Sequence, residues 1–156
     1  MTEFEAWKAE QSQRWLNHLR DVKHDISRLE DEIAVARSLT LPSGIDYTVP
    51  YVRSSPSADA IPNAVARLEG MIADYCVALD AYLDELQDAR ERVACLCDAR
   101  HREVLTLYYL SGHSWATVSD KAGYSEIWCK QLRDEALPLV YDHIPPEWRT
   151  MIPRAD

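Results

Sequence analysis

The chain has 156 residues, 47% of them hydrophobic, and a formal net charge of −9. This length allows one domain or two small ones and enough apolar residues for a buried core. With only 4 glycines and 8 prolines against many Ala, Leu, Glu and Arg, the composition predicts an all-α fold. No apolar run approaches the ~18 residues of a membrane span, and the polar N-terminal stretch lacks a signal segment, so we expect a cytoplasmic protein without membrane contact.

The negative charge is concentrated in the N-terminal part of the chain. Residues 1–98 carry 18 Asp and Glu against 10 Lys and Arg, whereas residues 99–141 carry five of each kind. Nucleic-acid-binding proteins tend to be basic, because the phosphates that they neutralise release counterions. The C-terminal part is therefore compatible with DNA binding, but we expect a single copy to have weak non-specific affinity.

Residues 4–38 contain the first helical pattern. Apolar residues recur with alternating spacings of four and three, as at the a and d positions of a coiled coil. They are Trp15, Leu19, Val22, Ile26, Leu29, Ile33 and Ala36. Such a helix packs either on its own chain or against a second chain, and the spacing alone leaves both alternatives open.

Residues 40–62 interrupt this pattern with four prolines and a glycine, which predicts a loop. The simplest interpretation is a flexible tether. The run from Tyr47 to Tyr51 is compatible with a short extended segment inside it.

Residues 61–97 repeat the same alternation over five heptads. The positions are Ile61, Val65, Leu68, Ile72, Tyr75, Leu79, Tyr82, Leu86, Ala89, Val93 and Leu96. Two long helices of matched length, joined by a loop, predict an antiparallel hairpin. Met71, Val77, Ala78 and Leu83 widen the apolar face beyond a two-helix stripe. We therefore expect hairpins to associate, most simply as a homodimer.

Residues 100–137 predict three short helices separated by two turns. Gly112 and Gly123 stand where the first two should end, since glycine is a common helix stop. Asp98, Ser114 and Ser125 are the predicted N-caps. The inward positions are Val104, Leu105, Tyr108 and Tyr109, then Trp115, Val118 and Ala122, then Cys129, Leu132 and Ala136. Two helices joined by a Gly-containing turn and braced by a preceding helix are the helix-turn-helix pattern.

Pro138 predicts the end of the third helix, because proline loses one helical hydrogen bond and clashes one turn back. Three more prolines follow in the tail. Its apolar residues Tyr141, Ile144, Trp148 and Met151 are expected to fold back on the module as a covering segment. The alternative is a peptide that docks on a partner.

A resemblance to known regulators covers roughly the last two thirds of the chain. It is carried by REVLTLYYLSGHSWATVSDKAGYSEIWCKQLRDEAL, which resembles region 4 of the sigma-70 family. The stretch resembles more closely the C-terminal module of phage transcriptional regulators of the ArpU and RinA type, and the preceding VRSSPSADAIPNAVARLEGM is similar to the same group. The resemblance implies DNA binding and control of phage genes.

The outer face of the third helix is the predicted recognition surface, because such helices place their early residues against base edges in the major groove. Gln131 suits adenine, Lys130 suits guanine or a phosphate, and Ile127 suits a thymine methyl. The predicted base-contacting residues are Ser125, Glu126, Ile127, Trp128, Lys130, Gln131 and Asp134.

Phosphate contacts are expected at the N-terminus of the second helix, where free N–H groups attract anions, and from nearby cations. The predicted residues are Arg100, Arg102, Ser114, Trp115, Thr117, Lys121 and Arg133. Taken singly, each is equally well explained as a cap, a core contact or a surface charge. Their clustering on one module favours DNA.

No enzyme motif is present, so we expect no enzymatic activity and no cofactor. Cys76 and Cys129 are interpreted as small buried hydrophobes. Cys95 and Cys97 would point about 200° apart on one helix, which argues against a metal site with His101. All five histidines are expected to be solvated: His18, His24, His101, His113 and His143.

The predicted organisation is a helical oligomerisation region over 1–98, a helix-turn-helix domain over 99–140 and a tail over 141–156. The predicted function is a sequence-specific, double-stranded-DNA-binding transcription regulator. A dimer would place two heads on half-sites about 34 Å apart or a multiple of it. The alternatives are a sigma-like protein that contacts RNA polymerase and a small-terminase-like DNA-packaging component, which would form a ring.

Overall fold

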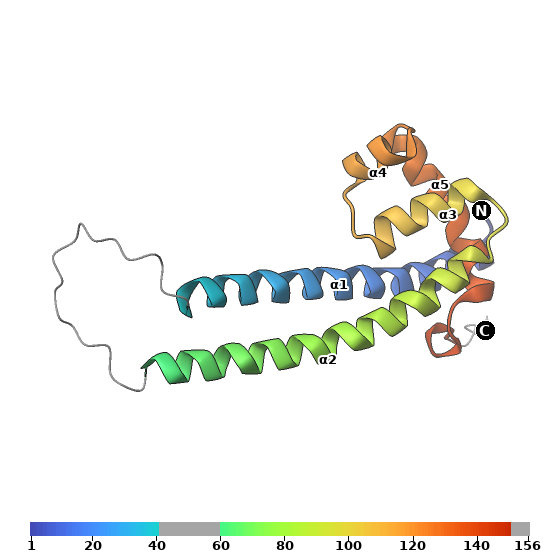
Figure 1. Ribbon diagram of the computed structural model, residues 1–156. Helices are drawn as coiled ribbons and strands as arrows, with labels where there is room; N and C mark the ends of the chain where they lie inside the picture. Colours follow the sequence, from blue (N-terminus) through green and yellow to red (C-terminus); the bar gives the residue numbers. More distant parts are fainter. Residues whose placement is uncertain (41–59, 151–156) are drawn as a thin grey trace. The chain divides into compact units, whose positions relative to one another are not determined.

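The computed structural model describes residues 1–40 and 60–150, and over these ranges every regular element is a helix (Figure 1). The elements are α1 (Glu3–Thr40), α2 (Ala60–Ala94), α3 (Ala99–Leu105), the π-helix η1 (Thr106–Leu110), α4 (Trp115–Ala122), α5 (Glu126–Val140) and the 3-10 turns η2 (Tyr141–His143) and η3 (Pro146–Trp148). The all-α prediction is confirmed. The prediction for Tyr47–Tyr51 lies outside the described residues.

The chain divides into two compact units, and the division cuts both long helices. One unit joins Met1–His24 to Tyr82–Asp156, so it holds the start of α1, the end of α2 and everything after α2. The other unit is Asp25–Ala81, which contains the rest of α1 and the start of α2.

In the unit Asp25–Ala81, two heptad positions of α1 are buried and one heptad position of α2 contacts α1. Ile26 and Ile33 are buried, and the Tyr75 hydroxyl donates a hydrogen bond of 2.7 Å to the Glu30 carboxylate. Large apolar side chains remain exposed on both helices: Val35, Leu39, Val65 and Val77. Val35, Leu39 and Val77 lie beside the heptad positions, whereas Val65 is itself a heptad position that is 40% exposed. The unit's own described residues therefore leave apolar surface uncovered on both helices.

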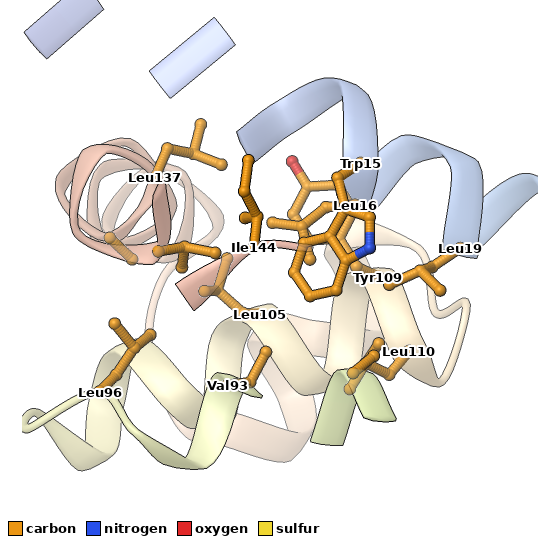
Figure 2. Packing of buried hydrophobic residues seen from close by; sticks show 13 residues of the cluster. Trp15, Leu16, Leu19, Val93, Leu96, Leu105, Tyr109, Leu110, Leu137 and Ile144 are labelled. Carbon is orange, nitrogen blue, oxygen red and sulfur yellow. The ribbon is translucent and has the colours of Figure 1, made fainter. Parts of the chain in front are cut away.

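The larger unit is built around a main core that draws on every helix but α4 (Figure 2). Its buried residues are Trp15, Leu16, Leu19, Ala89, Val93, Leu96, Leu105, Tyr109, Leu110, Ala136, Leu137, Val140 and Ile144. Ile144 is fully buried, and Tyr141 and Trp148 pack against the same core. The described part of the tail therefore covers the main core, to which α1 and α2 contribute as well as the module that it was expected to cover, whereas Met151 lies outside the described residues.

A second, smaller module core holds α3, α4 and α5 together. It consists of Val104, Val118, Cys129 and Leu132, all fully buried. Desolvation by burial raises the pKa of the Cys129 thiol, which agrees with its predicted place on the inner face. These side chains confirm the inward positions read from helical spacing.

The predicted helix ends of this module are also confirmed. Asp98, Ser114 and Ser125 are N-caps whose side chains accept hydrogen bonds from amides inside the first turn. Gly112 and Gly123 have φ values of +74° and +77°, in the left-handed region that residues other than glycine rarely adopt. Local sequence chemistry therefore sets where each of these helices starts and stops.

The predicted boundaries at Pro138 and at residue 97 are wrong. Pro138 lies inside the last turn of α5, where Leu137 and Val140 are buried in the main core. The carbonyl that it frees belongs to exposed Asp134, where water can donate a hydrogen bond.

The second long helix ends at Ala94 instead of residue 97, and Cys95–Asp98 form a connection to α3. The Arg102 guanidinium donates to the carbonyls of Leu96 and Cys97 and so holds this connection in place. Cys95 and Cys97 consequently do not share a helix, and both are exposed.

Two predictions of exposure are also wrong. Cys76 is exposed, because it lies beside the seam position Tyr75 and does not face α1. His101 is buried, since it lies on the face of α3 that packs against α5, where its Nε2 atom is 3.5 Å from the Glu135 carboxylate. Helical spacing alone predicted neither the exposure of Cys76 nor the burial of His101.

Candidate nucleic-acid interface

Helix α5 has two opposite faces with opposite surroundings. Cys129, Leu132 and Ala136 are fully buried on its inner face. The outer ridge, which we define as Glu126, Ile127, Lys130, Gln131 and Asp134, is exposed along its whole length. Ile127 is 81% exposed, which is unusual for a large apolar side chain. The chain's own described side chains do not cover this ridge.

The predicted base-contacting residues are thus gathered on one element. Ser125 caps α5 through its Oγ atom, which accepts a hydrogen bond of 3.2 Å from the Trp128 amide. Trp128 is half-buried and packs against the module core, so it lies at the edge of the ridge. The Gln131 amide donates to the Glu135 carboxylate at 3.1 Å, a contact that can exchange at the surface for a base edge.

The turn between α4 and α5 keeps the two helices in a fixed arrangement. The Ser119 hydroxyl donates to the Tyr124 carbonyl across the turn that contains Gly123. At the start of α4, Ser114 Oγ accepts from the Thr117 amide at 3.4 Å and lies 3.1 Å from the Thr117 hydroxyl. Ser114 and Thr117 are therefore engaged as a helix cap, and they stand together at the α4 N-terminus as predicted.

The predicted phosphate-binding cations differ in their surroundings. Arg100 pairs with Asp98 at 2.7 Å, and the side chain and amide of Arg100 hold the pKa of the Asp98 carboxyl well below its usual range. Arg102 is occupied by two carbonyls, as described above, and Arg133 pairs with Asp134 at 2.7 Å. Within the described residues, Lys121 and Lys130 are exposed and make no ion pair.

An aromatic stack connects the predicted residues of α4 and α5. The rings of Tyr108 and Trp115 are stacked with centroids 3.9 Å apart and planes 14° apart. Arg133 and Lys130 approach the Trp115 ring, at 5.2 and 5.9 Å from its centroid. The structure thus brings the predicted base-contacting residue Lys130 together with Trp115 and Arg133, which were predicted to contact phosphates.

One member of this arrangement was missed from the sequence. Arg20, on α1, lies with its guanidinium carbon 4.0 Å from the centroid of the Tyr108 ring. Its Nη1 atom donates to the carbonyls of Tyr108 and His113, the latter at 2.9 Å. Arg20 and Tyr108 are 88 residues apart, and no local pattern in the sequence pairs them.

The described residues hold neither a cluster of metal ligands nor a membrane-spanning helix. No three His, Cys, Asp or Glu side chains in residues 1–40 and 60–150 converge as metal ligands. No helix in the same ranges has the length and apolarity needed to span a membrane. No protein-family model, curated protein or solved structure matches the chain.

Proposed function

We propose that the protein is a sequence-specific, double-stranded-DNA-binding transcription regulator of the phage type, in which α4 and α5 act as a helix-turn-helix. The observation that carries the proposal is the outer ridge of α5. It is a mostly polar, exposed helix face, and the helix that bears it is held from behind by the buried residues Cys129, Leu132 and Ala136. A rigid helix with an uncovered polar face is what major-groove recognition requires.

The ridge has side chains suited to base edges. Gln131 can bond adenine in a bidentate manner, Lys130 can donate to guanine, and the exposed Ile127 side chain can contact a thymine methyl. Lys121 and Lys130 supply charge for phosphates, and Arg102 is better explained by its bonds to the α2–α3 connection. With two unpaired lysines per head, we expect a salt dependence of about −2 in the slope of log K against log [salt] for each head.

We also propose that a second copy of the chain covers the apolar side chains left exposed in the unit Asp25–Ala81. Val77 is 73% exposed and Leu39 is 81% exposed, although both belong to long amphipathic helices. A homodimer would bury such residues and would tether two weak heads, which raises the effective concentration of the second head.

The other candidate function is contact with a protein such as RNA polymerase. It is favoured by one specific observation, the 81% exposure of Ile127 near the N-terminal end of the ridge. An exposed apolar residue with a half-buried aromatic beside it is typical of protein-docking surfaces. A ring-forming packaging component would be distinguished by a mass of many subunits.

The decisive experiment compares DNA binding of two double variants by fluorescence anisotropy at several salt concentrations. Lys130→Ala with Gln131→Ala removes the ridge contacts. Gln13→Ala with Arg14→Ala is the matched control, since these exposed side chains on α1 are also one amide and one cation. We expect the first pair to weaken specific binding at least about 10-fold and the control to leave it within about twofold. Equal affinities would show that α5 is not the reading helix.

A further inference from the structure

The N-terminal helix reaches the reading helix through a column of stacked side chains. In order, the column contains Arg20 of α1, Tyr108 of η1, Trp115 of α4 and Arg133 of α5. Tyr108 stacks on the Trp115 indole at 3.9 Å, and Arg133 and Lys130 lie 5.2 and 5.9 Å from the centroid of the same ring. Cations over aromatic rings are attracted by the ring quadrupole, and the attraction grows as water is excluded.

Arg20, at the α1 end of this column, is held by several contacts at once. Arg20 is half-buried, stacks on the Tyr108 ring and donates to the carbonyl of Tyr108 in η1 and to that of His113 in the connection between η1 and α4. Tyr108 lies in the last turn of its helix, where backbone acceptors lack partners within the helix. Only an arginine offers both a planar cation and a fork of donors for such a site.

A second contact joins the same turn to α1. A Cβ atom added at Gly112 would lie 3.1 Å from the Lys23 side chain and 3.7 Å from that of His24, so the turn after η1 lies closely against α1. Arg20, Lys23 and His24 lie on one face of α1, because positions i, i+3 and i+4 of a helix are neighbours. The position of the Tyr108 ring is therefore set by α1 and not by the module alone.

We propose that Arg20 is a positioning residue for DNA reading, which acts through Tyr108 and Trp115 on Lys130 and Arg133. The proposal rests on the proposed function of α5. Arg20 does not touch DNA in this account. It holds the aromatic pair that limits the conformations of Lys130 on the outer ridge and of Arg133 beside it, so that these cations lose less freedom on binding.

The test uses the full-length chain with Arg20→Met, Arg20→Lys and the control Arg14→Met, which removes an exposed cation from the same helix. We expect Arg20→Met to weaken specific DNA binding about fivefold to 10-fold while the salt slope stays unchanged. A direct phosphate contact would instead reduce the slope by about 0.9. Arg20→Lys should not restore affinity, because lysine keeps the charge but not the planar fork.

Two further measurements separate positioning from a general loss of stability. In a Lys130→Ala background, Arg20→Met should have a smaller effect than in the wild type, because the two residues act through one arrangement. In protein labelled with 5-fluorotryptophan, the ¹⁹F resonance of Trp115, assigned with Trp115→Phe, should shift in Arg20→Met and Arg20→Lys but not in Arg14→Met.

The inference is overturned if Arg20→Met and Arg14→Met bind DNA equally, or if the effects of Arg20→Met and Lys130→Ala add independently. If Arg20→Met does not fold, Arg20→Lys carries the same test, and wild-type affinity in that variant overturns it. A wild-type protein that binds no DNA refutes the proposed function instead, while the Trp115 resonance still reports whether Arg20 holds the column.

Discussion

At the scale of residues, α5 separates buried side chains that hold the helix from exposed side chains on its outer ridge. Leu132 is fully buried in the module core, and Ile127, five positions earlier, is 81% exposed. Both are branched aliphatic residues of one helix, so they differ mainly in how far they are buried. Substitutions at these two positions can therefore separate effects on folding stability from effects on DNA recognition.

We predict opposite consequences for the same truncation at these two positions. Leu132→Ala should lower the free energy of unfolding by about 2–5 kcal/mol, because it leaves a cavity in a packed core. Ile127→Ala should change it by less than about 0.5 kcal/mol and should weaken DNA binding instead. Urea denaturation followed by circular dichroism measures the first effect. Comparable losses of stability in both variants would contradict the assignment of faces.

The Asp98 carboxylate predicts a loss of stability in acid. Its pKa in the folded protein is lowered by hydrogen bonds from the side chain and amide of Arg100, so the ionised form favours folding. That contribution is present above the unfolded pKa of about 3.9 and is lost as the pH falls through the lower pKa of the folded state.

The test variant is Asp98→Asn, which keeps a capping oxygen but no charge. Its unfolding midpoint in urea should lie below that of the wild type at pH 7, and the difference should shrink as the pH falls below about 4. A constant difference between pH 7 and pH 3 would show that the charge of Asp98 does not contribute.

At the scale of elements, the sequence predicts helices and their caps well and connections poorly. The heptads of α1 and α2 and the caps at Ser114 and Ser125 follow from local rules, because spacing and capping act within one turn or two. Pro138 and the break after Ala94 do not, since burial of Leu137 and the bonds of Arg102 are tertiary effects.

The same substitution, Gly to Ala, tests these local rules at two positions. Gly70 lies inside α2 with open space around its missing Cβ, so Gly70→Ala should stabilise the protein by about 0.5–1 kcal/mol. Gly123 ends α4 with a φ of +77°, so Gly123→Ala should destabilise it by about 1–2 kcal/mol despite equally open space. Thermal unfolding distinguishes the two signs. Effects of the same sign would mean that backbone conformation does not decide them.

At the scale of the whole molecule, the candidate site was only partly predictable. The outer ridge follows from helical periodicity once Cys129 and Leu132 are recognised as inward. Arg20 could not be found in this way, because its contact with Tyr108 joins residues that are distant in the chain. Sequence alone likewise does not tell which arginines already bond to other groups of the chain, as Arg102 does to the carbonyls of Leu96 and Cys97.

The assembly proposed for the long helices predicts a dimer in solution. Sedimentation velocity at micromolar concentration should give twice the mass of the 17.9 kDa chain. Val77→Glu should shift the protein toward monomer, because it buries a charge in the proposed interface, whereas Ile127→Glu should not. A monomeric wild type would refute the dimer, and a ring of many subunits would favour the packaging alternative.

The most direct test of the central claim is selection of bound sequences from random duplex DNA by the wild-type protein at near-physiological salt. The outer ridge of α5 predicts that a defined motif is enriched. It also predicts that Lys130→Ala with Gln131→Ala loses the preference at one or two of its positions. No enriched motif, or the same motif selected equally well by the double variant, would contradict the claim that α5 reads DNA.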